Sequence, residues 1–265
     1  MNCQFLRRQA APLFAAAALA LAGPVSIHAQ GRAGRGGPAG PPRSPQASAP
    51  VDLTGYWVAL VTEDWRWRMV TAPKGDVASV PLNPEGRRVA NEWDPAKDEA
   101  AGNQCKAYGA AGIMRIPTRL HITWPDENTL KVETDAGTQT RLFHFGPAEP
   151  AGEATWQGYS AAQWDVVAAG GRGGRGGAPP QGGSLKVVTN HLKAGYLRKN
   201  GVPYSANATV TEYLDRTMEP DGNSYLIVTT IVEDPTYLAQ PFITSTHFKR
   251  EADGAKWHPT PCEAR

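Results

Sequence analysis

The chain has 265 residues with a formal net charge of +2 at pH 7, and 20% of its residues are charged. This balance excludes a strongly basic nucleic-acid-binding domain and an acidic solvating tail. The length allows one domain with a sizeable core even after terminal segments are set aside.

Residues 1–29 have the pattern of a secretory signal peptide. Arg7 and Arg8 precede the apolar run PLFAAAALALAGPV, and the small residue Ala29 ends the segment. The run is shorter than the ~20 apolar residues that a membrane-spanning helix needs, which favours a cleaved signal over a retained anchor. We therefore expect a periplasmic or extracellular protein whose mature chain is not inserted in a membrane.

Two segments are dominated by Gly, Pro and Arg, namely residues 30–50 and residues 169–183. Such compositions bury little apolar surface, so we expect a disordered linker and a flexible insert. Arg-Gly-Gly runs also occur in RNA-binding segments, but an exported protein has little access to RNA, so nucleic acid is not an expected partner. The folded part is therefore predicted to be a single domain over residues 51–265.

This domain is predicted to be all-β. Alternating apolar residues between turn sequences such as PDEN, DAG and PDGN predict strands over residues 54–61, 65–69, 119–124, 129–134, 138–145, 160–167, 184–191, 208–216, 224–232 and 242–250. Residues 83–103 are the one helical candidate and predict one or two short helices. About 8–10 strands with so little helix indicate an antiparallel β-barrel, with a sandwich as the alternative.

The first strand favours the barrel. Gly55, Tyr56 and Trp57 open it, and Arg250 closes the last strand. This arrangement resembles the Gly-x-Trp start of lipocalin-like (calycin) barrels, in which the tryptophan seals the floor and a late arginine lies across it. A tryptophan that is simply part of the core is the alternative. Closure of the sheet also removes exposed edges.

Cys105 and Cys262 are the cysteines that remain once the signal peptide, with Cys3, is removed. In an oxidising compartment such a pair predicts a disulfide. A metal site using His258 and Cys262 is the alternative, but the chain has only one such pair and none of the usual histidine spacings. We therefore expect neither a metal ion nor another cofactor.

The second half resembles a widespread family of exported bacterial proteins of unknown function. The resemblance rests on six features in chain order: a Trp-x-Gly-x-Ser turn, a Trp-acid strand end, a Leu-x-Val-x-Thr strand, a Gly-x-Pro-x-Ser loop, a Thr-Glu strand and an Asp-Pro turn. Here they are Trp156, Gly158 and Ser160; Trp164 and Asp165; Leu185, Val187 and Thr189; Gly201, Pro203 and Ser205; Thr211 and Glu212; and Asp234, Pro235 and Pro241. Many relatives carry a histidine where this chain has Tyr204, which counts against a histidine base there. The resemblance implies export and a β-rich fold, and it implies no activity.

The stretch GYLRKNGVPYS, residues 195–205, is the candidate rim of a site. It joins two predicted strands, and alternation places His191 and Glu212 on their inward faces. Tyr196, Arg198 and Tyr204 then become candidate ligand contacts at the lip of the barrel. The structural alternative is that Glu212 pairs with an arginine such as Arg198 while His191 lies near solvent.

His121 and His144 are two further candidate ligand contacts, because they lie in strands that flank a hairpin and are able to meet across the sheet. Ser160 is not in a Gly-x-Ser-x-Gly elbow, and no phosphate loop or dinucleotide fingerprint is present.

Two functions follow from these residues. The first is a barrel that binds a small apolar or aromatic ligand in its mouth. The alternative is an acid–base enzyme, a hydrolase, lyase or isomerase, that uses Glu212 and His191 with Tyr204 as catalytic residues on a small organic substrate. Binding is favoured because no nucleophile or cofactor motif accompanies the acid. A scaffold with a filled barrel and an exposed apolar patch is a third possibility.

Overall fold

The structure is a computed structural model that describes residues 43–147, 150, 152–166 and 182–265. The predicted signal peptide, most of the predicted linker and almost all of the Gly-rich insert lie outside the described residues. In the described part, no helix is long and apolar enough to cross a membrane.

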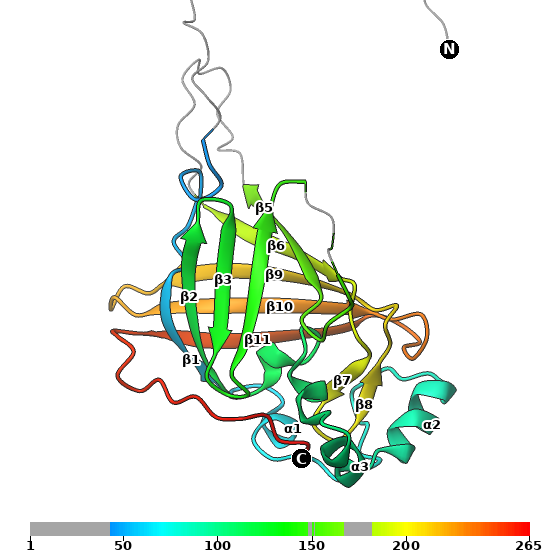
Figure 1. The fold of residues 1–265 in the computed structure, drawn as a ribbon. Helices are drawn as coiled ribbons and strands as arrows, with labels where there is room; N and C mark the ends of the chain where they lie inside the picture. Colours follow the sequence, from blue (N-terminus) through cyan, green and yellow to red (C-terminus); the bar gives the residue numbers. More distant parts are fainter. Residues whose placement is uncertain (1–42, 148–149, 151, 167–181) are drawn as a thin grey trace, which may run out of the picture. The chain divides into compact units, whose positions relative to one another are not determined.

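Nine strands form a closed barrel (Figure 1). Around the barrel they are β1 (Gly55–Leu60), β11 (Phe242–Glu251), β10 (Ser224–Glu233), β9 (Thr209–Met218), β6 (Gly183–Asn190), β5 (Tyr159–Val166), β4 (Gln139–Phe145), β3 (Thr129–Thr134) and β2 (Arg119–Asp126). The predicted all-β barrel is thus confirmed, and its strand number falls within the expected range.

The sequence predicted an antiparallel barrel, and this prediction is not strictly correct. β4 and β5 pair in parallel, with Phe143 opposite Ser160 and Phe145 opposite Ala162, whereas all other neighbours in the barrel are antiparallel. A parallel pair needs a connection longer than a hairpin turn, and residues 146–158 provide it.

Side chains fill the interior of the barrel. On each strand the inward-facing residues alternate with outward-facing ones, as in the burial pattern of β10, where every second residue from Ser224 to Val232 is buried. The inward set is mostly aliphatic and aromatic: Trp57, Leu120, Ile122, Leu130, Val132, Phe143, Leu185, Val187, Leu214, Leu226, Val228 and Phe248. The barrel is therefore a packed core rather than an open ligand cavity.

Trp57 seals one end of this core. Its indole Nε1 donates to the backbone oxygen of Leu53 at 3.0 Å, and the guanidinium of Arg250 lies over its ring at 5.4 Å. Gly55 permits this approach, because it has a φ of 108° and a Cβ there would lie 2.9 Å from the Arg250 guanidinium. This is the tryptophan and late-arginine geometry that the Gly-x-Trp start of the strand led us to expect.

Short helices gather at the opposite end of the barrel (Figure 1): α2 (Pro84–Glu92), α3 (Pro95–Ala100) and the 3₁₀ turns η1 (Gln104–Tyr108) and η2 (Ile113–Arg115). The side chains of Asn83 and Asp94 accept hydrogen bonds from the first turns of α2 and α3, and a proline follows each cap. The predicted helical segment 83–103 is thus confirmed as two helices.

The predicted strand over residues 65–69 is wrong, because Trp65–Arg68 form the short helix α1. β1 already pairs with β2 on one side and β11 on the other, so the closed barrel offers no edge for another strand. The alternation also assigned the wrong face, since Arg68 is buried while Trp65 and Met69 are exposed.

The stretch 195–205 is a β-hairpin and not an exposed lip. β7 (Gly195–Arg198) pairs with β8 (Val202–Tyr204), and most of its residues are buried. Leu197, Val202 and Tyr204 belong to a second apolar core beneath α2. At the turn, Gly201 has a φ of 80° and lies against the Trp93 ring, where a Cβ would come within 2.1 Å of a ring carbon.

Cys105 and Cys262 form a disulfide, as the sequence predicted. The bond ties the C-terminal segment to η1 at the helical end of the barrel. Part of the predicted linker is also packed: the Pro45 carbonyl accepts a hydrogen bond from Trp164 Nε1 at 2.9 Å. Contacts with the barrel therefore begin before residue 51.

Candidate functional site

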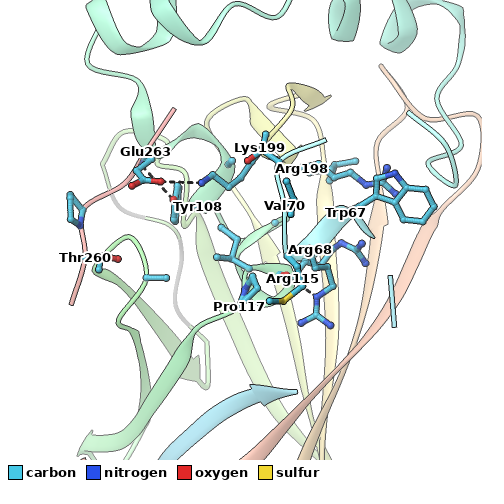
Figure 2. Close-up of a pocket in the computed structure, with 18 residues that line it drawn as sticks. Trp67, Arg68, Val70, Tyr108, Arg115, Pro117, Arg198, Lys199, Thr260 and Glu263 are labelled. Carbon is cyan, nitrogen blue, oxygen red and sulfur yellow. Dashed lines mark hydrogen bonds and ion pairs between the residues drawn. The ribbon is translucent and has the colours of Figure 1, made fainter. Parts of the chain in front are cut away.

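A cavity with a volume of about 300 Å³ lies beside the helical end of the barrel. We call it the mouth pocket. Figure 2 shows its lining. Four stretches contribute side chains or backbone, namely residues 67–71, 107–117, 197–199 and 260–263, together with Ala136. The volume is at the lower end of the range typical of small-molecule sites.

Three arginines line the mouth pocket: Arg68, Arg115 and Arg198. They are 7%, 6% and 5% exposed, so the guanidinium groups are largely withdrawn from bulk water. Arg68 ion-pairs with Glu63, and its Nε donates to the backbone oxygen of Arg115 at 2.8 Å. In Figure 2 they lie on the side of Trp67, opposite Thr260 and Glu263.

Arg115 and Arg198 differ in their partners. Arg115 Nη2 donates to Asp64 Oδ2 at 2.9 Å. Arg198 Nη1 donates to the backbone oxygen of Ala78 at 2.8 Å, and its guanidinium lies 4.9 Å from the centre of the Trp67 ring. Among the described residues, no carboxylate oxygen lies within 4.0 Å of Arg198. It is the one arginine of the three without an ion pair there.

Each guanidinium keeps an unused donor. Within the described part of the chain, Arg68 Nη2, Arg115 Nη1 and Arg198 Nε are buried nitrogens with no hydrogen-bond partner. Buried donors are normally satisfied, and an unsatisfied one costs about 1–3 kcal/mol, more when the group is charged. These three nitrogens have essentially no accessible surface, so they lie behind the cavity wall and show how far the guanidinium groups are withdrawn from water.

Burial lowers the pKa of two of these arginines. For Arg198 the pKa falls to about 10, mainly through burial and then through repulsion by Arg115. For Arg68 the pKa is also lowered, again chiefly by burial, although Glu63 opposes the shift. Both remain cations at neutral pH, held in an environment that disfavours their charge.

Apolar side chains continue from the pocket onto the surface. Trp67, Val70 and Ile116 line the cavity, and Val70 is 70% exposed. Met69, which also lines the cavity, is 59% exposed, and Trp65, at the start of α1, is 67% exposed. The site thus combines a cationic wall with an apolar rim, which suits a molecule with an apolar body and a polar end.

Glu212 lies in the barrel interior, on the face that the alternation assigns to it. Its two carboxylate oxygens accept from Arg141 Nη1 at 3.0 Å and from Arg141 Nη2 at 2.6 Å, and both side chains are fully buried. Arg141 also donates to Thr189, whose hydroxyl lies 2.7 Å from that of Ser160. The partner of Glu212 is therefore Arg141, and not Arg198 as the structural alternative suggested.

His191 does not join Glu212. It follows β6, four residues beyond Val187, which is the residue opposite Glu212, and this separation corresponds to about 13 Å along a strand. Its Nε2 lies 3.1 Å from the backbone oxygen of Gly152. The predicted pair of an interior acid and an imidazole is thus not assembled.

The two tyrosines of the hairpin also lie elsewhere than predicted. Tyr196 donates to Asp98 Oδ2 at 2.7 Å, away from the mouth pocket, and burial followed by this bond raises the pKa of its hydroxyl. Tyr204 is completely buried in the second core, and burial raises the pKa of its hydroxyl too. Of the predicted lip residues, Arg198 alone lines the mouth pocket.

His121 and His144 do not meet across the sheet. They lie on β2 and β4, with β3 between them, opposite Glu133 and Thr129 of that strand. His121 stacks on Tyr56 at 4.2 Å, and His144 stacks on Tyr159 at 5.2 Å. Both alternate with inward-facing residues and therefore belong to the outer surface of the barrel.

Sequence reasoning missed Arg68, Arg115 and Trp67. Trp67 and Arg68 are neighbours in the chain, but Arg115 lies 47 residues after Arg68, and no short motif joins it to them. The available signal was the unusual WRWRM stretch, whose arginines alternate with large apolar residues but which was assigned to a strand. Among the described residues, no group of three His, Cys, Asp or Glu side chains is arranged to hold a metal ion.

Tyr204 provides a test of its role. Its hydroxyl is buried and has no hydrogen-bond partner among the residues that the structure describes. We expect Tyr204→Phe to leave the free energy of unfolding unchanged or to raise it by up to about 1 kcal/mol, because an unsatisfied polar group is removed. Urea denaturation measures this. A loss above about 1 kcal/mol would show that the hydroxyl has a stabilising partner.

Comparisons of the chain with family models, with curated proteins and with solved structures find no match.

Proposed function

We propose that this protein is a β-barrel that binds a small organic molecule with an apolar or aromatic part, and that the molecule occupies the mouth pocket. The observation that carries the proposal is a cavity of about 300 Å³ beside a barrel whose interior is filled. Aromatic and aliphatic side chains with a few convergent polar groups are the usual lining of such sites.

The enzyme alternative finds less support. It needs Glu212 to reach a substrate, yet both carboxylate oxygens bond to Arg141 and the side chain has no exposed surface. His191 lies four residues along the chain from Val187, the residue opposite Glu212, and Tyr204 makes no hydrogen bond to Glu212 among the described residues. A general base must come within hydrogen-bond reach of the proton that it abstracts.

We also propose that the protein works outside the cytoplasm. The Cys105–Cys262 disulfide supports this, because such bonds persist mainly in oxidising compartments. The signal-peptide pattern over residues 1–29 is consistent with the same location.

The pocket can be blocked from its rim. Val70 lines the mouth pocket and is exposed, so Val70→Trp is expected to place an indole in or across the opening with little effect on folding. We expect this variant to weaken binding of small aromatic probes at least about tenfold through steric exclusion. Isothermal titration with charged and neutral naphthalene derivatives measures it.

Val166→Trp is the matched control. Val166 is also exposed but lies at the end of β5 and does not line the pocket. The Val166→Trp variant should bind the probes with the same affinity as the wild type. Equal probe affinity in the wild type, Val70→Trp and Val166→Trp would place the site elsewhere and contradict the proposal, as would the absence of binding to any probe.

A further inference from the structure

We propose that the mouth pocket selects a monoanion, and specifically a small aromatic carboxylate, whose carboxylate group compensates the charge of Arg198 while its ring lies against the apolar rim. This inference rests on the proposed binding function and adds the charge and the chemical class of the ligand.

The balance of charge around the pocket carries the first step. Four cationic side chains line it: Arg68, Arg115, Arg198 and Lys199. Glu63, Asp64 and Glu263 pair with three of them.

Counting histidines as neutral, one positive charge is left over, and it belongs to Arg198. Asp76 stabilises the Arg198 cation at longer range, but its carboxylate is already paired with Arg66, at 3.0 Å from Nη2. A buried charge without a partner is unfavourable, and a ligand that carries one negative charge compensates it.

The chemistry of the guanidinium group gives the second reason. Arg198 lines the pocket, is more than nine-tenths buried and has no carboxylate partner among the described residues. A carboxylate has two oxygens that accept several hydrogen bonds, and guanidinium groups match its geometry. A neutral amide of the same shape presents one acceptor oxygen and two donors, which the arginines cannot use.

The rest of the pocket sets the body of the ligand. Trp67 and Ile116 line the cavity, and the Trp67 ring already stacks with the Arg198 guanidinium. A flat ring that carries a carboxylate fits both features within about 300 Å³. A phosphate monoester carries a charge of about −1.5 to −2 at neutral pH, more than the single uncompensated cation requires.

The deciding experiment compares ligands of one shape on the wild-type mature chain. Isothermal titration is carried out with 2-naphthoate, 2-naphthamide and 2-naphthyl phosphate at fixed ionic strength. We expect 2-naphthoate to bind about ten- to hundredfold more tightly than 2-naphthamide, because its carboxylate compensates the Arg198 charge in a site withdrawn from water. We expect 2-naphthyl phosphate to bind no more tightly than 2-naphthoate.

Variants then locate the charge. Arg198→Met should remove most of the preference for 2-naphthoate and change the affinity for 2-naphthamide by less than about twofold, while Arg88→Met, an exposed arginine on α2, should change neither. If Arg198→Met does not fold, Lys199→Met replaces it, because it removes one positive charge from the same pocket lining. It should likewise reduce the preference for 2-naphthoate over 2-naphthamide.

The outcomes separate the two proposals. Equal affinity for 2-naphthoate and 2-naphthamide would overturn the monoanion inference and leave the binding function standing. Tighter binding of 2-naphthyl phosphate would overturn the carboxylate assignment. No binding of any of the three would overturn the binding function itself.

Discussion

Glu212→Gln is expected to lower the free energy of unfolding by about 3–5 kcal/mol, because it leaves the Arg141 cation buried without a counter-charge. Both side chains have no exposed surface, and two hydrogen bonds join them inside the barrel. Glutamine keeps the shape of the side chain, so the loss reports the charge and not a cavity. Urea denaturation measures it.

The double variant Arg141→Met/Glu212→Met is the control for this result. It removes both charges at similar volume and should be close to the wild type in stability, or above it, since a well-packed apolar pair often replaces a buried ion pair without loss. Binding of naphthalene probes at the mouth pocket should survive in the double variant. A stable Glu212→Gln protein that has lost a catalytic activity would instead favour the acid–base enzyme.

Removal of the disulfide is the second large effect that we expect. The double variant Cys105→Ser/Cys262→Ser should lose up to about 5 kcal/mol of unfolding free energy, because a bond between residues 157 positions apart greatly restricts the unfolded chain. Thermal and urea denaturation measure the loss. The wild type in a thiol reductant should approach the stability of the variant, which should itself be insensitive to the reductant.

The disulfide should also affect ligand binding. Cys262 is adjacent to Pro261 and Glu263, which line the mouth pocket, and the bond anchors this segment to η1. We expect the variant to bind naphthalene probes more weakly even under conditions in which it is fully folded. Two free thiols in the unreduced wild type, or an unchanged stability in the variant, would contradict the role assigned to this bond.

The sequence by itself determined the barrel and its disulfide. Alternation in stretches such as 184–191 and 208–216 set which side chains face the core, because the period of a strand is two and one face of a barrel is buried. Residues 83–103 were expected to form one or two short helices, and Asn83 and Asp94, each followed by a proline, cap the two that form, because capping is a local interaction. With Cys3 set aside as part of the predicted signal peptide, two cysteines were left and one pairing was available.

Only the tertiary structure decided the partners and the site. Alternation placed Glu212 inside, but the identity of its partner, Arg141, depends on how β4 and β9 come together across the closed barrel. WRWRM has the pattern of a strand, yet most of it forms a helix, because β1 has no free edge with which it could pair. A local sequence pattern does not show which strand edges are already paired. Tyr204 was expected at a lip and lies in a core, since burial of the hairpin depends on α2 packing over it.

The mouth pocket is the clearest example of a feature that the local sequence does not predict. Arg68, Arg115 and Arg198 come from α1, η2 and β7, and each stands in a segment that by its own sequence is as well suited to a solvated surface. Convergence of three like charges is unfavourable in isolation, and it is set by the packing of the helical end against the barrel rather than by any local preference. The sequence therefore determined the scaffold, because hydrophobic periodicity is a local property, while the fold alone brought the charges of the site together.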